Sequence, residues 1–223
     1  MLREEYINPF LLSIKLALTA NFIILLISIP LACFIYFYKN KFTNIIDIFI
    51  NIPLILPPSV LGFYLLILLN KESFIGKLWF TMTEKTLVFH FSGLVIGSII
   101  YSFPFVIRPI LTTLNLFPKQ FIAVSASLGN SPLRTFFNVV LPFLKPAIIS
   151  GFLLGFLHTI GEFGIVLMLG GSIPGETKTI AIAIFDAVEQ LDYESANKMS
   201  LILFFCISLI LILLGFNKKL KNI

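Results

Sequence analysis

The side chains best suited to chemistry are a carboxylate and an imidazole that lie in the same apolar stretch. Glu162 follows His158 by four residues, and residues at this spacing share one face of a continuous helix. A carboxylate in a membrane span is costly and normally faces a partner or a cavity. We therefore predict that His158 and Glu162 form a hydrogen-bonded pair with a structural or gating role. Contact with the substrate and proton coupling are the alternatives that these residues leave open.

Other reactive groups are too few and too scattered to build a conventional active site. The sequence has two histidines, His90 and His158, and no phosphate-binding glycine-rich loop with a lysine. No pair of His and Cys residues has the spacing of metal ligands. We therefore expect a protein that is not an enzyme, with no cofactor or metal in this chain. Any energy it uses must come from a partner or an ion gradient.

The composition indicates a membrane protein. Of the 223 residues, 58% are hydrophobic and 12% are charged, whereas a soluble domain is about 25% charged. This excludes a soluble enzyme, a disordered chain and a nucleic-acid-binding protein. The 16 basic residues lie between apolar blocks rather than on one face, so they indicate orientation in a lipid bilayer and no nucleic-acid partner.

Several apolar segments are long enough to cross the hydrocarbon of a bilayer, which takes about 20 helical residues. They predict an all-α polytopic membrane protein with about five transmembrane helices, in which residues 1–223 form one transmembrane domain. Lys and Arg number nine on one side and seven on the other, and the richer side is normally cytoplasmic. We therefore expect the N-terminus outside and the C-terminus in the cytoplasm. The predicted spans are residues 16–37, 48–69, 87–111, 147–169 and 199–216.

The long segment 112–146, on the predicted cytoplasmic side, contains too many prolines, glycines and polar residues to cross lipid cheaply. Within it, residues 119–128 form a predicted short helix that ends at Gly129. A short helix parallel to the membrane, ended by a glycine and followed by a turn, is a rigid knob that can sit in the cleft of a partner. An ordinary connecting loop is the alternative interpretation.

The same segment resembles the EAA loop of ABC importer permeases. The family pattern is Glu-Ala-Ala, three residues, Gly, nine residues, Ile, any residue, Leu-Pro. This sequence has Ala-Val-Ser at the first three positions, so it lacks the acidic residue, and Val in place of Ile. The resemblance implies that segment 112–146 is a cytoplasmic loop that couples the chain to an ATPase. The coupling residues are then Ala123, Val124, Ser125, Gly129, Leu141 and Pro142.

Further segments appear in the order and spacing seen in the membrane subunit of molybdate ABC importers, and this resemblance runs from Leu12 to about Thr179. It implies a type I ABC importer permease fold and a homodimer in the cytoplasmic (inner) membrane. It also implies two cytoplasmic ABC ATPase subunits, which use the ATP, and an extracytoplasmic oxyanion-binding protein. The segments are residues 53–58, 102–104, 131–142, 161–164 and 173–177.

The function that this resemblance implies is the translocation of molybdate by an ATP-driven importer. The same machinery carrying tungstate or sulfate is the first alternative, since segment 161–164 recurs in tungstate relatives. A secondary transporter driven by ions is a second alternative, and a membrane enzyme is a third.

Two adjacent prolines are predicted to break the second span. Pro57 and Pro58 remove two backbone donors and disfavour helix in the preceding residue. Carbonyls freed at membrane depth are tolerated only against protein or a water-filled cavity. We therefore place both prolines and Ser59, whose hydroxyl can bind an oxyanion, at the translocation path or gate, together with His158 and Glu162. A packed kink is the alternative.

Two other places carry predictions. A Pro-Gly pair marks a turn on the predicted outer side, which we expect to contact the binding protein or form part of an outer gate. A low-complexity loop is the alternative. At the inner end of the third span, Arg108 either snorkels to the interface or guides an anion inward. The residues of the outer turn are Pro174, Gly175, Glu176 and Thr177.

Overall fold

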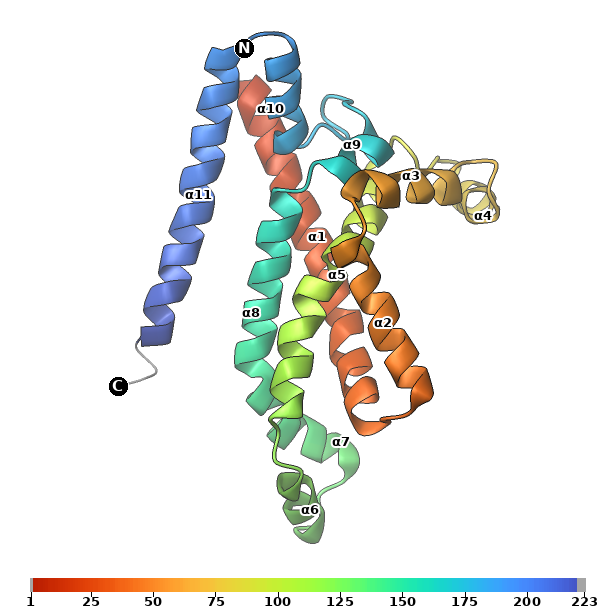
Figure 1. The fold of residues 1–223 in the computed structure, drawn as a ribbon, viewed down its shortest axis with the longest axis vertical. Helices are drawn as coiled ribbons and strands as arrows, with labels where there is room; N and C mark the ends of the chain where they lie inside the picture. The colour runs from red at the N-terminus through yellow and green to blue at the C-terminus, as the bar shows by residue number, and fades with distance from the viewer. Residues whose placement is uncertain (1, 220–223) are drawn as a thin grey trace.

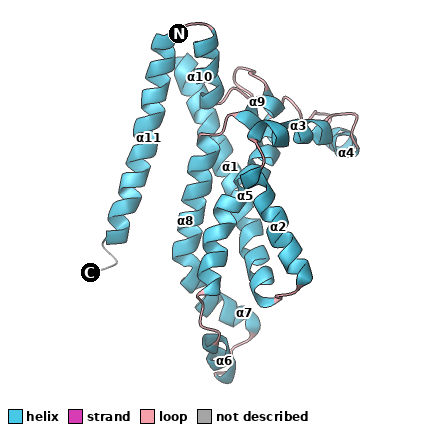
Figure 2. Ribbon diagram, in the orientation of Figure 1, coloured by secondary structure: helices cyan, strands magenta, loops and turns pink. Residues whose placement is uncertain are grey.

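The structure is a computed structural model that describes residues 2–219, with side chains described for residues 6–212. The helices are α1 (Leu2–Phe37), α2 (Lys41–Ile55), α3 (Pro58–Leu69), α4 (Phe74–Thr83), α5 (Phe91–Asn115), α6 (Gln120–Ser127), α7 (Pro132–Thr135), the π-helical η1 (Phe136–Val140), α8 (Leu141–Ile160), α9 (Gly164–Gly170), α10 (Ile180–Glu189) and α11 (Tyr193–Lys219). Among the described residues there is no strand (Figure 2). The long helices run along the longest axis, with α6 and α7 at one end and α4, α9 and α10 towards the other (Figure 1).

Four helical stretches are long and apolar enough to cross a membrane, and the bent pair of α2 and α3 makes a fifth. The prediction of an all-α protein with about five spans is therefore confirmed. The fourth predicted span, residues 147–169, is not one helix, because α8 ends at Ile160 and α9 begins at Gly164. The four stretches are Tyr6–Phe37, Phe91–Asn115, Pro132–Ile160 and Tyr193–Ile212.

The elbow between α2 and α3 confirms the predicted break in the second span. Leu56 and Pro57 are extended, each with ψ of 137°. Pro58 lies in the first turn of α3, where its missing N–H leaves no helical hydrogen bond unmade. The two helices meet at 114°, so α3 runs across the bundle instead of continuing along it (Figure 1).

The helix α5 lies against α1, α8 and α9 and forms the centre of the bundle. Its contact with α8 is unusually close, because a Cβ added at Gly151 would lie 2.5 Å from the carbonyl oxygen of Val106. A Cβ at Gly155 would lie 2.1 Å from Oδ1 of Asn21 in α1. Small residues four positions apart allow helices to approach in this way, and here they fix the spacing of α1, α5 and α8.

The last helix, α11, packs mainly against α10. At its start, Asp192 Oδ1 accepts a hydrogen bond from the N–H of Ser195 at 3.1 Å, and the hydroxyls of Ser195 and Tyr6 lie 2.8 Å apart, which ties α11 to α1. Further along, α11 exposes large apolar side chains, as lipid or another subunit would require. These include Leu201, Ile202, Phe204, Phe205, Leu209, Leu211 and Ile212.

Candidate functional site

The tip formed by α6 and α7 presents large apolar side chains on its surface. Val124, Leu128 and Leu133 are 56%, 76% and 72% exposed, and Ala123 is exposed beside them. Clustered apolar side chains at a surface mark sites of interaction with another protein or a membrane. The surface of this tip therefore has the character of an interaction site.

Ser125 holds the tip together instead of facing a partner. It is buried, and its Oγ lies 2.8 Å from Oγ1 of Thr135 at the end of α7. The Nδ2 of Asn130 donates a hydrogen bond to the same Oγ at 3.2 Å. Among the predicted coupling residues, Ser125 is thus a positioning residue that fixes α6 against α7.

Gly129 ends α6, as the sequence predicts. Its φ is +78°, a backbone conformation that glycine adopts without steric cost and other residues rarely adopt. The N–H groups of Gly129 and Asn130 donate to the carbonyl oxygens of Ala126 and Ser125 at 2.9 and 3.1 Å, which satisfies the end of the helix. A Cβ at Gly129 would meet no atom within 4 Å, so the need for glycine is conformational and not steric.

The Leu-Pro pair of the predicted pattern lies at the start of α8 and not on the exposed tip. The N–H of Leu141 donates to the carbonyl oxygen of Phe136 across the π-helical turn η1, and Pro142 has no N–H to donate. Leu141 and Pro142 therefore join the tip to a membrane span as one helical body.

A buried polar cluster lies in the other half of the bundle, and it corrects one prediction. Ser98 Oγ donates to Oε2 of Glu162 at 3.1 Å, and Ser102 Oγ lies 3.0 Å from Nδ1 of His158. The predicted His158–Glu162 hydrogen bond is wrong, because α8 ends at Ile160 and the two side chains no longer share a helix face. Glu162 is 5% exposed, and its Oε1 has no hydrogen-bond partner in the described part of the chain.

The cluster extends from α5 to α1 and holds the imidazole ring in place. Oγ1 of Thr159 lies 2.9 Å from Ser102 Oγ and accepts from Nδ2 of Asn21 at 3.3 Å. The ring of Phe105 stacks on the ring of His158 with centroids 3.9 Å apart. Sequence reasoning missed both serines, although Ser98 and Ser102 stand one helical turn apart in an apolar span and so form a polar stripe.

The turn that carries Glu162 lies against the proline elbow. A Cβ added at Gly164 would lie 2.8 Å from Cβ of Pro58 and 3.6 Å from the backbone nitrogen of Ser59, and α9 packs along α3. Ser59 itself is exposed. The structure therefore brings together the two segments that the sequence predicts at the path or gate, although they lie far apart in the chain.

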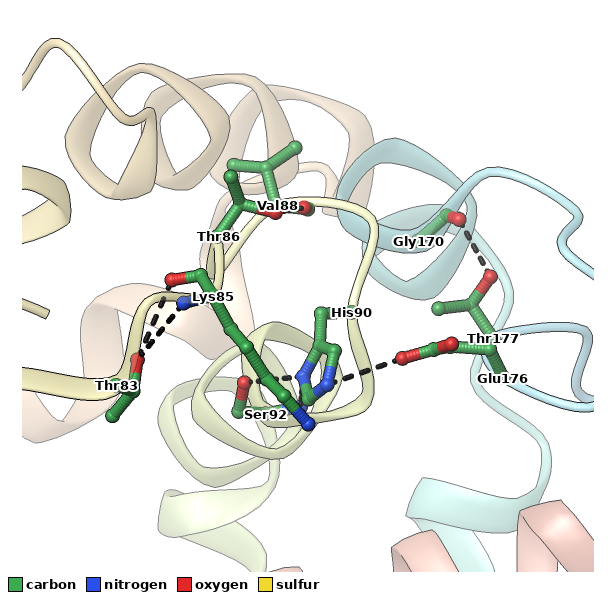
Figure 3. A network of polar contacts seen from close by, with 9 residues as sticks. All are labelled: Thr83, Lys85, Thr86, Val88, His90, Ser92, Gly170, Glu176 and Thr177. Atoms are coloured by element: carbon green, nitrogen blue, oxygen red, sulfur yellow. Dashed lines mark hydrogen bonds and ion pairs between the residues drawn. The ribbon is translucent and has the colours of Figure 1, made fainter. Parts of the chain in front are cut away.

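At the far end of the bundle, a contact between two polar side chains joins the loop before α5 to the loop between α9 and α10. Nε2 of His90 lies 3.1 Å from Oε1 of Glu176, and Nδ1 of His90 lies 2.8 Å from Oγ of Ser92 (Figure 3). Glu176 thus contacts the N-cap residue of α5, the helix that also carries the serines of the buried cluster.

Within the predicted outer contact, the residues divide into exposed and buried ones. Pro174 and Gly175 are exposed, so they remain free to meet a partner. Thr177 is fully buried, and its Oγ1 donates to the carbonyl oxygen of Gly170 at 2.6 Å (Figure 3). Its side chain holds the loop in shape and does not take part in a surface contact.

Comparison with known proteins identifies the relatives of this chain. Residues 24–220 match the family described as binding-protein-dependent transport system inner membrane component. The chain is 38% identical over 196 residues to the molybdenum transport system permease protein ModB of Azotobacter vinelandii, covering 88% of this chain and 87% of the relative. It is 33% identical over 191 residues to a probable sulfate transport system permease protein, cysT, of Chlorokybus atmophyticus, covering 86% of this chain and 66% of that relative.

A solved structure supports the fold. A chain of the MetNI methionine ABC transporter, in an inward-facing conformation, aligns with a TM-score of 0.71, covering 100% of this chain and 95% of that chain at 13% identity. At this identity the likeness concerns the fold alone, and it agrees with the permease fold that the sequence implies.

Proposed function

Because the chain belongs to the family of inner membrane components of binding-protein-dependent transport systems, we propose that it is the permease subunit of an ATP-driven importer that translocates molybdate. The observation that carries this proposal is the 38% identity to a molybdenum transport permease over most of both chains. The exposed, glycine-ended tip of α6 and α7 gives such a permease a place to receive an ATPase.

In this proposal the tip docks on a cytoplasmic ABC ATPase subunit. Val124 and Leu128 provide apolar surface for the contact, and the hydrogen bonds of Ser125 keep α6 fixed to α7. Since η1 and α8 follow α7 without a break, a displacement of the tip moves α8 as a body. The conformational change that ATP binding and hydrolysis cause in the partner is thereby transmitted to the membrane spans.

The far end of α8 leads into the gate. The turn after α8 is braced to α5 through Ser98 and Glu162, and Gly164 rests on the elbow at Pro58. A movement of α8 therefore shifts the elbow and the polar cluster together. Glu162 serves this step as a positioning residue, and an anionic side chain at this place is a poor ligand for an oxyanion.

The rest of the assembly follows from the same premise. Two copies of the chain form the pathway, two ATPase subunits dock at the α6 ends, and an extracytoplasmic binding protein docks at the opposite end, near Pro174 and Gly175. The chain lies in the cytoplasmic membrane with its N-terminus outside. The exposed apolar surfaces of α11 and of the tip support an assembly of several subunits.

Reconstituted vesicles test the proposal. We expect uptake of labelled molybdate when the permease is combined with the ATPase, ATP and a loaded binding protein. We expect no uptake by the permease alone, since its sequence has no phosphate-binding glycine-rich loop with a lysine. Uptake of sulfate or tungstate in preference to molybdate would assign the same machinery to another oxyanion. Uptake driven by an ion gradient without the ATPase would contradict the proposal and favour a secondary transporter.

A further inference from the structure

A cavity of about 540 Å³ lies between α2, α5 and α8, on the side of the polar cluster that is nearer to α6. Its walls are Leu54 of α2 and residues from two stretches, 104–113 of α5 and 146–154 of α8. It is open on one side and does not include Glu162. The cavity adjoins the polar cluster through Phe105, whose ring stacks on His158, and it lies within the membrane-spanning part of the bundle.

Arg108 is the only ionisable side chain among the residues that line this cavity. Its Nη2 lies 3.0 Å from Oδ1 of Asp47 and donates to the carbonyl oxygen of Asp47 at 3.3 Å. The Nε of Arg108 is buried and has no acceptor among the described residues. A guanidinium carries five N–H donors, and both contacts of Asp47 are made to Nη2, so the Nη1 group is left to donate to a ligand.

Arg108 makes a contact that neither of its two sequence interpretations, snorkelling or guiding an anion, predicts. It lies nearly two turns before the end of α5 at Asn115, and it pairs with α2 instead of reaching along the helix to an interface. Asp47, which sequence reasoning missed, is the only acidic residue between Glu5 and Glu72. A lone carboxylate next to a predicted span is the signal that could have found it.

We propose that this cavity is an oxyanion-binding station on the membrane pathway, in which Arg108 binds the tetrahedral anion and Asp47 holds the guanidinium between passages. The inference rests on the proposed function and names a site for it. Arginine suits oxyanions because its planar group donates two parallel hydrogen bonds. Thr112, Thr113 and Ser150 are also among the lining residues, and a hydroxyl group can donate to the remaining oxygens of the anion.

The ion pair explains why such a station does not trap its ligand. A bare arginine in an apolar cavity would hold a divalent anion tightly, whereas transport requires a site that the ligand also leaves. Asp47 competes for the same guanidinium and so weakens the site. The phosphate of an anionic lipid has the same chemistry as the substrate, and the experiment below separates the two.

The test uses the complete complex of permease, ATPase and binding protein in vesicles. With Arg108→Gln we expect initial molybdate uptake to fall about tenfold, as the loss of one charge-assisted hydrogen bond predicts, while ATP hydrolysis stimulated by the loaded binding protein stays within about twofold. The matched control is Lys77→Gln, which breaks an exposed ion pair with Glu72 and should leave uptake at the wild-type rate.

Two further variants separate an anion site from a structural ion pair. The double variant with Asp47→Arg and Arg108→Asp keeps the ion pair but moves the positive charge to α2. We expect its molybdate uptake to stay well below the wild-type rate, and uptake at the wild-type rate would overturn the inference. Asp47→Asn keeps the guanidinium, so we expect a loss of no more than about threefold. Equal losses in Asp47→Asn and Arg108→Gln would mean that the pair alone matters. If Arg108→Gln does not assemble, the charge-exchange variant still tests the inference, because it keeps the ion pair and changes only which helix carries the positive charge.

The lipid arm repeats the assay in vesicles of phosphatidylcholine, with and without phosphatidylglycerol. We expect the Arg108→Gln defect to be the same in both, whereas a defect that needs phosphatidylglycerol would assign the site to a lipid phosphate and overturn the inference. Failure of the proposed function itself looks different, since the wild-type complex would then take up no oxyanion. Wild-type uptake with an unaffected Arg108→Gln variant would contradict the oxyanion station alone.

Discussion

Replacing Gly129 with valine is expected to uncouple the permease from its ATPase while leaving membrane insertion intact. The φ of +78° at this position costs an ordinary residue about 1–2 kcal/mol, and a β-branched side chain tolerates it least. The chain will relieve this strain by changing the end of α6. Since about 1.4 kcal/mol is a factor of ten in an equilibrium, docking of the ATPase should weaken about tenfold or more. Co-purification of the ATPase and molybdate uptake measure the effect.

Two matched controls isolate the cause of this loss. Asparagine tolerates a left-handed conformation, so Gly129→Asn should keep most of the docking. Gly175 has the same φ of +78° and equally free space around it, but it lies at the opposite end of the molecule. Gly175→Val therefore imposes a similar strain, and it should leave co-purification of the ATPase unaffected. Equal loss of docking in both valine variants would contradict the assignment of the tip.

Replacing Glu162 with alanine is expected to destabilise the protein and abolish efficient transport. The change removes the acceptor of the Ser98 hydroxyl at a buried site, and a buried donor left without its partner costs about 1–3 kcal/mol. It also frees the turn between α8 and α9 from α5. We expect a lower melting temperature of the purified permease and uptake reduced about tenfold or more.

The variants Glu162→Gln and Ser98→Ala distinguish a brace from a proton carrier. Glutamine keeps an oxygen that accepts from Ser98, so a brace should retain most of the uptake, whereas Ser98→Ala should lose part of it by removing the same bond. If Glu162 carried protons, Glu162→Gln would be as inactive as Glu162→Ala, and uptake would depend on the pH gradient. That result would contradict the positioning role.

The features that the sequence predicted correctly depend on local rules. Gly129 ends α6 because its backbone conformation is set within one turn of chain. Pro57 and Pro58 bend the second span because proline acts on its own helix and on the preceding residue. The number of spans follows from the length of the apolar segments. None of these requires knowledge of which helices become neighbours.

The features that the sequence missed depend on contacts between distant segments. The helix α8 ends before Glu162, where Gly164 must lie against Pro58 of a different span, and this end separated the predicted His158–Glu162 pair. Glu162 and His158 instead contact Ser98 and Ser102 of α5. No local pattern in the sequence pairs α5 with the turn after α8. The burial of Thr177 likewise results from a fold of the loop back onto Gly170. The orientation of the chain in the membrane stays a prediction.

Site-directed cross-linking tests the central claim, that α6 and α7 form the ATPase docking tip, most directly. The natural cysteines Cys33 and Cys206 are first replaced by serine, and a single cysteine is then introduced as Val124→Cys or Pro174→Cys in the assembled complex. We predict that the cysteine at position 124 cross-links to the ATPase subunit and the one at position 174 does not. Cross-linking of position 124 to the binding protein, or of position 174 to the ATPase, would contradict the account.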